Sequence, residues 1–206
     1  MKRQVFVLAG MLLAASVAHA GPVSELRSPG NFHGVELRGA LDIDVQVGNA
    51  TRVEVSADSD IIKQITTTIK DGKLIVATPD HMRDAKVHVS ITAPAIDALT
   101  LSGAGKLHAT GLASSNLALS ISGAGDLQVT GSADTVAVDM SGAGEIRGKD
   151  LTAKSMTIDM NGTGNAILTA TDSLTASLSG VGNVEVYGHP KSVTKHVNGI
   201  GHIKLR

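Results

Sequence analysis

Two aspartates, Asp139 and Asp159, have the residue type and the spacing for chemistry. Each stands two residues before the start of a glycine-rich turn, in "DMSGAG" and in "DMNGTG". If these segments stack as neighbouring strands, the carboxylates lie about 4.8 Å apart, which suits Ca²⁺ binding or acid–base catalysis. The equivalent residues on either side, Ser120 and Ser177, carry no charge. The two aspartates are therefore surface candidates on a solvated strand face.

An enzyme that cleaves polysaccharides is the alternative function. Glycoside hydrolysis uses two carboxyl groups at a set separation, one of them with a raised pKa. The chain has no Trp, one Tyr and two Phe, so it offers no aromatic platform for a sugar ring, and no Lys or Arg cluster accompanies the aspartates. We expect a non-enzymatic protein without catalytic residues. A carbohydrate-active lyase or hydrolase on the same scaffold is the alternative.

The sequence lacks the standard metal and cofactor motifs. His189, His196 and His202 gather near the C-terminus, but their order fits no standard zinc spacing. The residue after each turn varies (Lys, Asp, Glu, Asn, Asn, His), whereas calcium-binding repeats keep an Asp there. "GAGEIRG" lacks the G-x-G-x-x-G spacing of a nucleotide-binding loop. We expect neither a metal nor a cofactor.

A four-residue turn that occurs six times organises the C-terminal half. The copies begin at 102, 122, 141, 161, 179 and 198 and read SGAG three times, then NGTG, SGVG and NGIG. A fixed period near twenty residues is typical of a solenoid, in which each repeat is one coil stacked on the next. The turns contribute twelve glycines, namely Gly103, Gly105, Gly123, Gly125, Gly142, Gly144, Gly162, Gly164, Gly180, Gly182, Gly199 and Gly201.

Between the turns, apolar residues alternate with small or polar ones, which is the period of a β-strand. No segment has the 3.6-residue apolar period of a helix. The sequence therefore predicts an all-β fold, a parallel β-helix with about 19–20 residues per coil over 97–206. The predicted inward positions include Leu99, Leu101, Leu107, Leu119, Ile121, Leu127, Val138, Met140 and Ile146.

The turn glycines fall on the inward side when residues are counted by twos through the turn. A Cβ at such a corner would collide with the facing strand or require a positive φ, so we expect a structural role for them. The residue between the glycines falls on the outward side and grows along the chain. These middle residues form an apolar corner for contacts, or lie buried if the alternation breaks: Ala104, Ala124, Ala143, Thr163, Val181 and Ile200.

Residues 23–96 have a less regular pattern. "FHGVELRGALDIDVQVG", "RVEVSA" and "AKVHVSITAP" predict strands, "SDIIKQI" predicts one helical turn, and Asp71-Gly72 predicts a hairpin. We expect an irregular β region that caps the N-terminal edge of the solenoid. At the other end, Lys195 takes an inward position, and a charge there discourages edge-to-edge stacking. Fraying of the last coil is the other interpretation of that lysine.

The first twenty residues have the order of a secretory signal peptide: "MKR", an apolar run and "AHA". The apolar run is shorter than the roughly 20 residues of a membrane-spanning helix. We expect cleavage after Ala20 and a single exported domain, 21–206, that is periplasmic or secreted and does not insert into a membrane.

The composition limits the partners. Of 18 basic and 19 acidic residues, Lys2 and Arg3 leave with the leader, so the mature net charge is −3, which gives no reason to expect nucleic acid. No Cys is present, so the fold depends on its core. An envelope or surface protein, or a glycan, is the partner that we expect for rigid faces on an exported protein.

The run of turns, together with "FHGVELRGALDIDVQVG" and "DGKLIV", resembles the bacterial head GIN domain family. The resemblance extends from about Phe32 to the C-terminus. It implies a right-handed parallel β-helix, and the family is described as the head of an auto-transporter adhesin. The family carries no established activity, so the resemblance assigns no catalytic residue.

Overall fold

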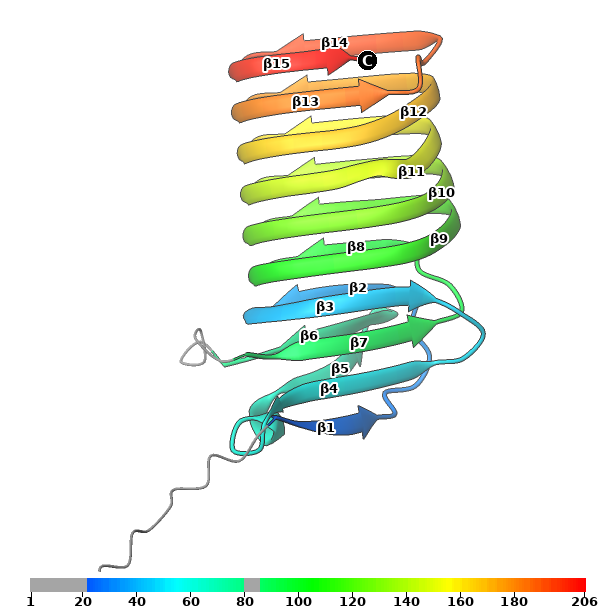
Figure 1. Ribbon diagram of the computed structural model, residues 1–206. Helices are drawn as coiled ribbons and strands as arrows, with labels where there is room; N and C mark the ends of the chain where they lie inside the picture. The colour runs from blue at the N-terminus through cyan, green and yellow to red at the C-terminus, as the bar shows by residue number, and fades with distance from the viewer. Residues whose placement is uncertain (1–21, 80–85) are drawn as a thin grey trace, which may run out of the picture.

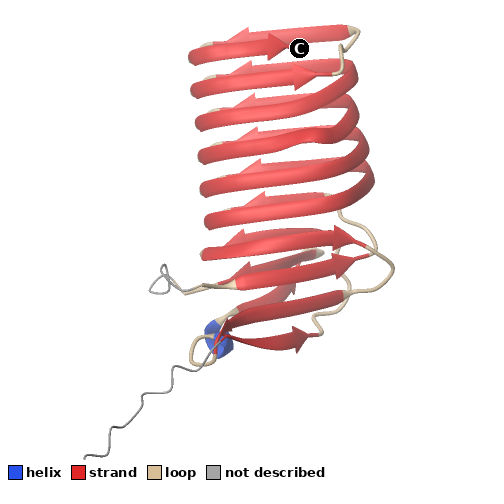
Figure 2. Ribbon diagram, in the orientation of Figure 1, coloured by secondary structure: helices blue, strands red, loops and turns tan. Residues whose placement is uncertain are grey.

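The structure is a computed structural model that describes residues 22–79 and 86–206. These residues form fifteen strands and one short 3-10 helix (Figure 2). The predicted signal peptide, 1–20, lies outside the described residues. Within the described ranges, no helix has both the length and the apolar character needed to cross a membrane.

The strands divide into a front half and a regular half. The front half contains β1 (Pro22–Arg27), β2 (Gly34–Arg38), β3 (Ala40–Val47), β4 (Arg52–Asp58), η1 (Ile62–Gln64), β5 (Thr66–Lys70), β6 (Lys73–Ala77), β7 (His88–Ala93) and β8 (Ala98–Leu101). The regular half contains β9 (Ala104–Ile121), β10 (Ala124–Met140), β11 (Ala143–Met160), β12 (Thr163–Leu178), β13 (Val181–Tyr187), β14 (Ser192–Val197) and β15 (Ile200–Leu205).

The regular half winds into stacked coils. Each of β9 to β12 runs along the near side, bends round one edge and returns along the far side (Figure 1). Successive strands pair in parallel and bring equivalent turn residues together, as with Gly105, Gly125 and Gly144. Near strands run to the right and far strands to the left as the chain rises, so the solenoid is right-handed (Figure 1). The predicted parallel β-helix is confirmed.

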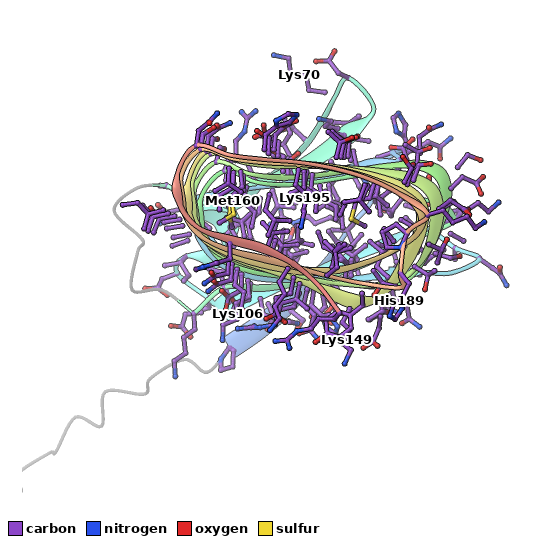
Figure 3. The ribbon with its side chains drawn as sticks, turned by 90° about the horizontal axis from the view of Figure 1, so that it is seen from above. Lys70, Lys106, Lys149, Met160, His189 and Lys195 are labelled. Carbon is purple, nitrogen blue, oxygen red and sulfur yellow. The ribbon has the colours of Figure 1, made fainter. Side chains whose placement is uncertain are left out.

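The predicted inward side chains fill one core. Leu107, Leu127 and Ile146 stack at zero exposure on the near side, and Leu119 and Val138 face them from the far side. Seen along the axis, the coils form a flattened oval with side chains inside it (Figure 3). Each large side chain that is fully buried stabilises the fold by about 1.5–3 kcal/mol, so a stack of coils holds together without disulfides.

β2 and β3 form a further coil inside the segment 23–96, whose sequence pattern is irregular. β2 pairs in parallel with β8, and β3 pairs in parallel with β9, so this coil continues the stack. Its other edge pairs in parallel with β6 and β7. The coil therefore lies between strands that all follow it in the sequence.

Antiparallel strands close the N-terminal end. β4 pairs with β7, β5 with β6, and β1 with β4. The predicted hairpin joins β5 to β6, with Asp71 at φ +51° and Gly72 at φ +73°, and the predicted helical turn is η1. No sequence pattern predicted β1, because five of its six residues are exposed and no apolar alternation marks it.

Candidate functional site

The twelve turn glycines form two columns along one edge of the solenoid. A Cβ built on any of them would lie 1.6–2.1 Å from a carbonyl oxygen of the preceding coil. For Gly123 that oxygen belongs to Gly103. The conflict therefore runs along the solenoid axis, and the predicted collision with the strand that faces the turn across the core is wrong. The second glycine of each turn also has a positive φ, between +135° and +159°.

Backbone hydrogen bonds also join the turns of successive coils, so the pairing between coils continues through the turn. Ser122 and Gly123 both donate from their backbone N–H groups to the carbonyl of Leu101, at 2.9 and 3.2 Å. Ala124 donates to the carbonyl of Gly103 at 2.8 Å, and the same three bonds recur at each later turn. Two backbones approach this closely only where no side chain separates them, which gives the glycines a structural role.

Gly39 extends the column formed by the first glycine of each turn, although the repeat pattern does not reveal it. The Cβ of Gly103 would lie 2.0 Å from its carbonyl oxygen, and Ala104 donates a hydrogen bond to that oxygen at 2.7 Å. The turn here reads "RGAL" instead of "SGAG". The similarity of "RGALDI" to "SGAGDL" could have revealed this turn. Of the two turn glycines, the segment keeps the first and has Leu41 in place of the second. Thr78 packs beneath Gly39 and accepts a hydrogen bond from Ala40 through Oγ1 at 2.9 Å.

The back face consists of the outward residues of 98–100, 116–120, 135–139, 155–159, 173–177 and 192–196, on the far side in Figure 1. Asp139 and Asp159 occupy paired positions on it and are exposed. Ser120 and Ser177 flank them in register. The structure thus brings the two predicted carboxylates onto neighbouring strands, where small, mostly uncharged side chains surround them.

The front face consists of the outward residues of 42–46, 88–92, 106–110, 126–130, 145–149, 165–169, 183–187 and 202–204, on the near side in Figure 1. Its N-terminal part is densely charged. Asp44 lies between two imidazoles, with Oδ2 at 3.3 Å from His88 Nε2 and Oδ1 at 3.5 Å from His108 Nδ1. These three side chains are 42–56% exposed. Ion pairs with such exposure contribute about 0–1 kcal/mol each, so the core and not this cluster holds the fold.

Arg147 extends the cluster toward the C-terminus. Its guanidinium pairs with Glu145, a neighbour on β11, and with Asp126 on β10 at 3.6 Å. The hydrogen bond to Glu145, followed by the charge of that carboxylate, raises the pKa of Arg147. The side chains of this cluster border a shallow hollow of about 230 Å³ that is lined by Asp42, Ile43, Asp44, His88, Lys106, Leu107, His108, Asp126, Gln128 and Arg147.

The C-terminal histidines do not meet. His196 lies on β14 on the back face, His202 lies on β15 on the front face, and His189 lies at the edge between β13 and β14 (Figure 3). Across residues 22–79 and 86–206, no group of three or more His, Cys, Asp or Glu is placed to hold a metal ion. The apolar corner does face outward: Val181 is 46% exposed and Ile200 is 74% exposed.

These features define the class: a right-handed parallel β-solenoid with one charged and one mostly neutral side face. The chain belongs to the family described as "Putative auto-transporter adhesin, head GIN domain", which matches residues 31–190. This confirms the resemblance that the turns indicated. A search of curated proteins finds no match.

A solved structure shares the fold. A Bacteroides fragilis protein described as a putative adhesin superposes with a TM-score of 0.72 at 19% identity, over 90% of this chain and 97% of that one. A Parabacteroides distasonis protein described as a putative lipid binding protein has a TM-score of 0.49 at 16% identity, over 90% of this chain and 97% of that one. At these identities the likeness to the first structure shows the fold alone.

Proposed function

We propose that the protein is an exported, non-enzymatic binding module that recognises an envelope glycan or surface protein through its front face. One observation carries the proposal: the front-face hollow presents carboxylate, imidazole, amide, ammonium and guanidinium groups from five adjacent strands. Binding sites place a few polar groups in fixed positions on a rigid scaffold. Membership of a family described as an adhesin head supports binding over catalysis.

Rigid presentation is the physical advantage of this site. The outward side chains stand on strands whose inward neighbours are buried, such as Ile43 at 1% and Leu107 at 0% exposure. Their backbone positions are therefore fixed by the core before any ligand arrives, which reduces the entropy lost on binding. Acidic and basic groups alternate across the hollow, so the site suits a neutral or mixed-charge polar ligand.

The test begins with the protein that starts at Gly21, screened against a glycan array and against solubilised envelope proteins. A front-face variant, Asp44→Ala with Arg147→Ala, removes two exposed charges that the fold does not need. The matched control on the back face is Asp139→Asn with Asp159→Asn, which also alters two exposed side chains. We expect the front-face variant to lose at least about tenfold in affinity and the back-face control to bind normally.

Other outcomes are equally informative. Loss of binding only in the back-face variant would move the site to Asp139 and Asp159. Shortening of an offered polysaccharide by the unaltered protein would support the carbohydrate-active alternative. Absence of any ligand in both screens would refute the proposal.

A further inference from the structure

The last coil presents an open edge. β14 pairs only with β12, and β15 pairs only with β13, so the described residues leave one side of each strand without a hydrogen-bonded neighbour. Alternate backbone N–H and C=O groups of such a strand point along the solenoid axis and can accept a further strand.

The inward side of this edge is apolar and partly uncovered. Val193 and Val197 stack on the buried Leu174 and Leu178, yet Val197 is itself 45% exposed. On the front side, Leu205 is 39% exposed. A strand laid on β14 would cover Val193 and Val197, as each coil covers the one before it.

Lys195 stands in the middle of this apolar row. It stacks on Ala176, which is fully buried, and Figure 3 shows its side chain within the outline of the coils. Its Nζ donates to the carbonyl of Ile203 on the opposite strand at 3.4 Å, and within the described residues it forms no salt bridge. A strand that covered Lys195 would remove an ammonium group from water, which is costly unless a carboxylate accompanies it.

The other basic residues near the open edge do not share the position of Lys195. From Val186 to Arg206 the sequence contains no Asp or Glu and four basic residues. Lys191 and Arg206 are paired with acids of the coil below, Asp172 and Glu185. Lys204 is an outward residue of the front face, so the positive charge that faces the open end is the charge of Lys195.

We propose that the edge of β14 is a docking site for an acidic partner strand, which adds in parallel and places an Asp or Glu over Lys195 between two apolar residues. The partner motif is apolar-x-acid-x-apolar, because side chains two residues apart share a face and the row beneath reads Val193, Lys195, Val197. Strand addition to an exposed edge is an established mode of peptide recognition. Lys195 makes it selective, since an uncharged strand would bury the ammonium group without a partner.

A second copy of the chain fits this edge less well. Two such coils meeting end to end would bring like charges together. Within the described residues, two strands at the opposite end have an unpaired edge, β1 and β5. β1 carries Val23, Glu25 and Arg27 on one face, so in the parallel register an arginine stands where the second apolar residue is required, and β5 contains no Asp or Glu.

The experiment measures fluorescence anisotropy of two labelled peptides, TSVTETVTS and TSVTKTVTS, with the protein that starts at Gly21. We expect the glutamate peptide to bind at least about tenfold more tightly than the lysine peptide, since like charges placed together oppose association. Lys195→Glu should reverse this preference. Lys204→Glu is the matched control, because it makes the same charge change on an outward residue of the same coil and should leave the preference intact.

Equal binding of both peptides, no binding of either, or the same effect from both variants would overturn the proposal. Hydrogen exchange on the unaltered protein gives a readout that needs no variant: the glutamate peptide should slow exchange of the 192–197 amides. Slowing at β1 instead, or end-to-end dimers in light scattering without peptide, would assign the edge to another use and also refute it.

Discussion

At the residue scale, the space that a side chain would occupy decides the architecture. Each turn glycine lies where a methyl group would overlap a carbonyl oxygen of the coil beneath. The requirement repeats at every level because the coils are in register, which is why the sequence repeats the turn. The intervening residue faces solvent and is free to vary from Ala to Ile.

Gly164→Ala tests this account. Its Cβ would lie 1.7 Å from the carbonyl oxygen of Gly144, and its φ is +150°. The backbone strain and the displaced coil should lower the free energy of unfolding by about 3 kcal/mol or more. Urea denaturation followed by circular dichroism measures the effect. Thr163→Ala, at the exposed neighbouring position, is the control and should stay within about 0.5 kcal/mol; an equal effect of the two changes would refute the steric explanation.

At the element scale, ion pairs supplement the backbone pairing of the last strands with the coil below. Arg206 donates to both carboxylate oxygens of Glu185, at 2.9 and 3.3 Å, and so ties the end of β15 to β13. This hydrogen bond, followed by the smaller effect of the opposite charge, lowers the pKa of Glu185 below its ordinary value of 4.5. Burial acts in the other direction but is weaker than the hydrogen bond.

The lowered pKa of Glu185 makes the stability of the β15 strand depend on pH. A depressed pKa in the folded state gives stability that is present above the ordinary value of 4.5 and is lost as the pH falls through the lowered value. We expect the β15 amides to lose protection against hydrogen exchange below pH 4.5, earlier than those of β10. Glu185→Gln should remove most of this pH step and leave β15 less protected near neutral pH. A step of unchanged size in that variant would show that another group causes it.

The sequence predicted the regular coils but not the coil of β2 and β3. The period near twenty and the alternation of apolar residues predicted the regular coils, because adjacent repeats there are neighbours in space. The coil of β2 and β3 was not predicted, since its partners β8 and β9 lie some fifty or more residues further on and its turn keeps only Gly39. The front-face cluster was missed for the same reason: Asp44 and His108 meet only through the pairing of β3 with β9.

At the scale of the whole molecule, the leader predicted at 1–20 leads us to expect delivery outside the cytoplasm. If "AHA" is the cleavage signal, the exported protein begins at Gly21, directly before β1. Mass spectrometry of protein collected from the periplasm or the medium should give the mass of residues 21–206. Ala20→Arg should block processing and leave the full-length form, because small residues are required at that site. Full-length, cytoplasmic protein from the unaltered gene would contradict export.

The position of the β2–β3 coil has a consequence for biogenesis. Synthesis from the N-terminus releases this coil before either of the layers that enclose it, so winding cannot progress from the first turn made to the last. The later turns, whose contacts are close in sequence, have the shorter loops to close and should consolidate first. The β2–β3 coil is therefore made before its neighbours but should fold after them. Until then both edges of this coil are unpaired and can pair wrongly with other nascent molecules.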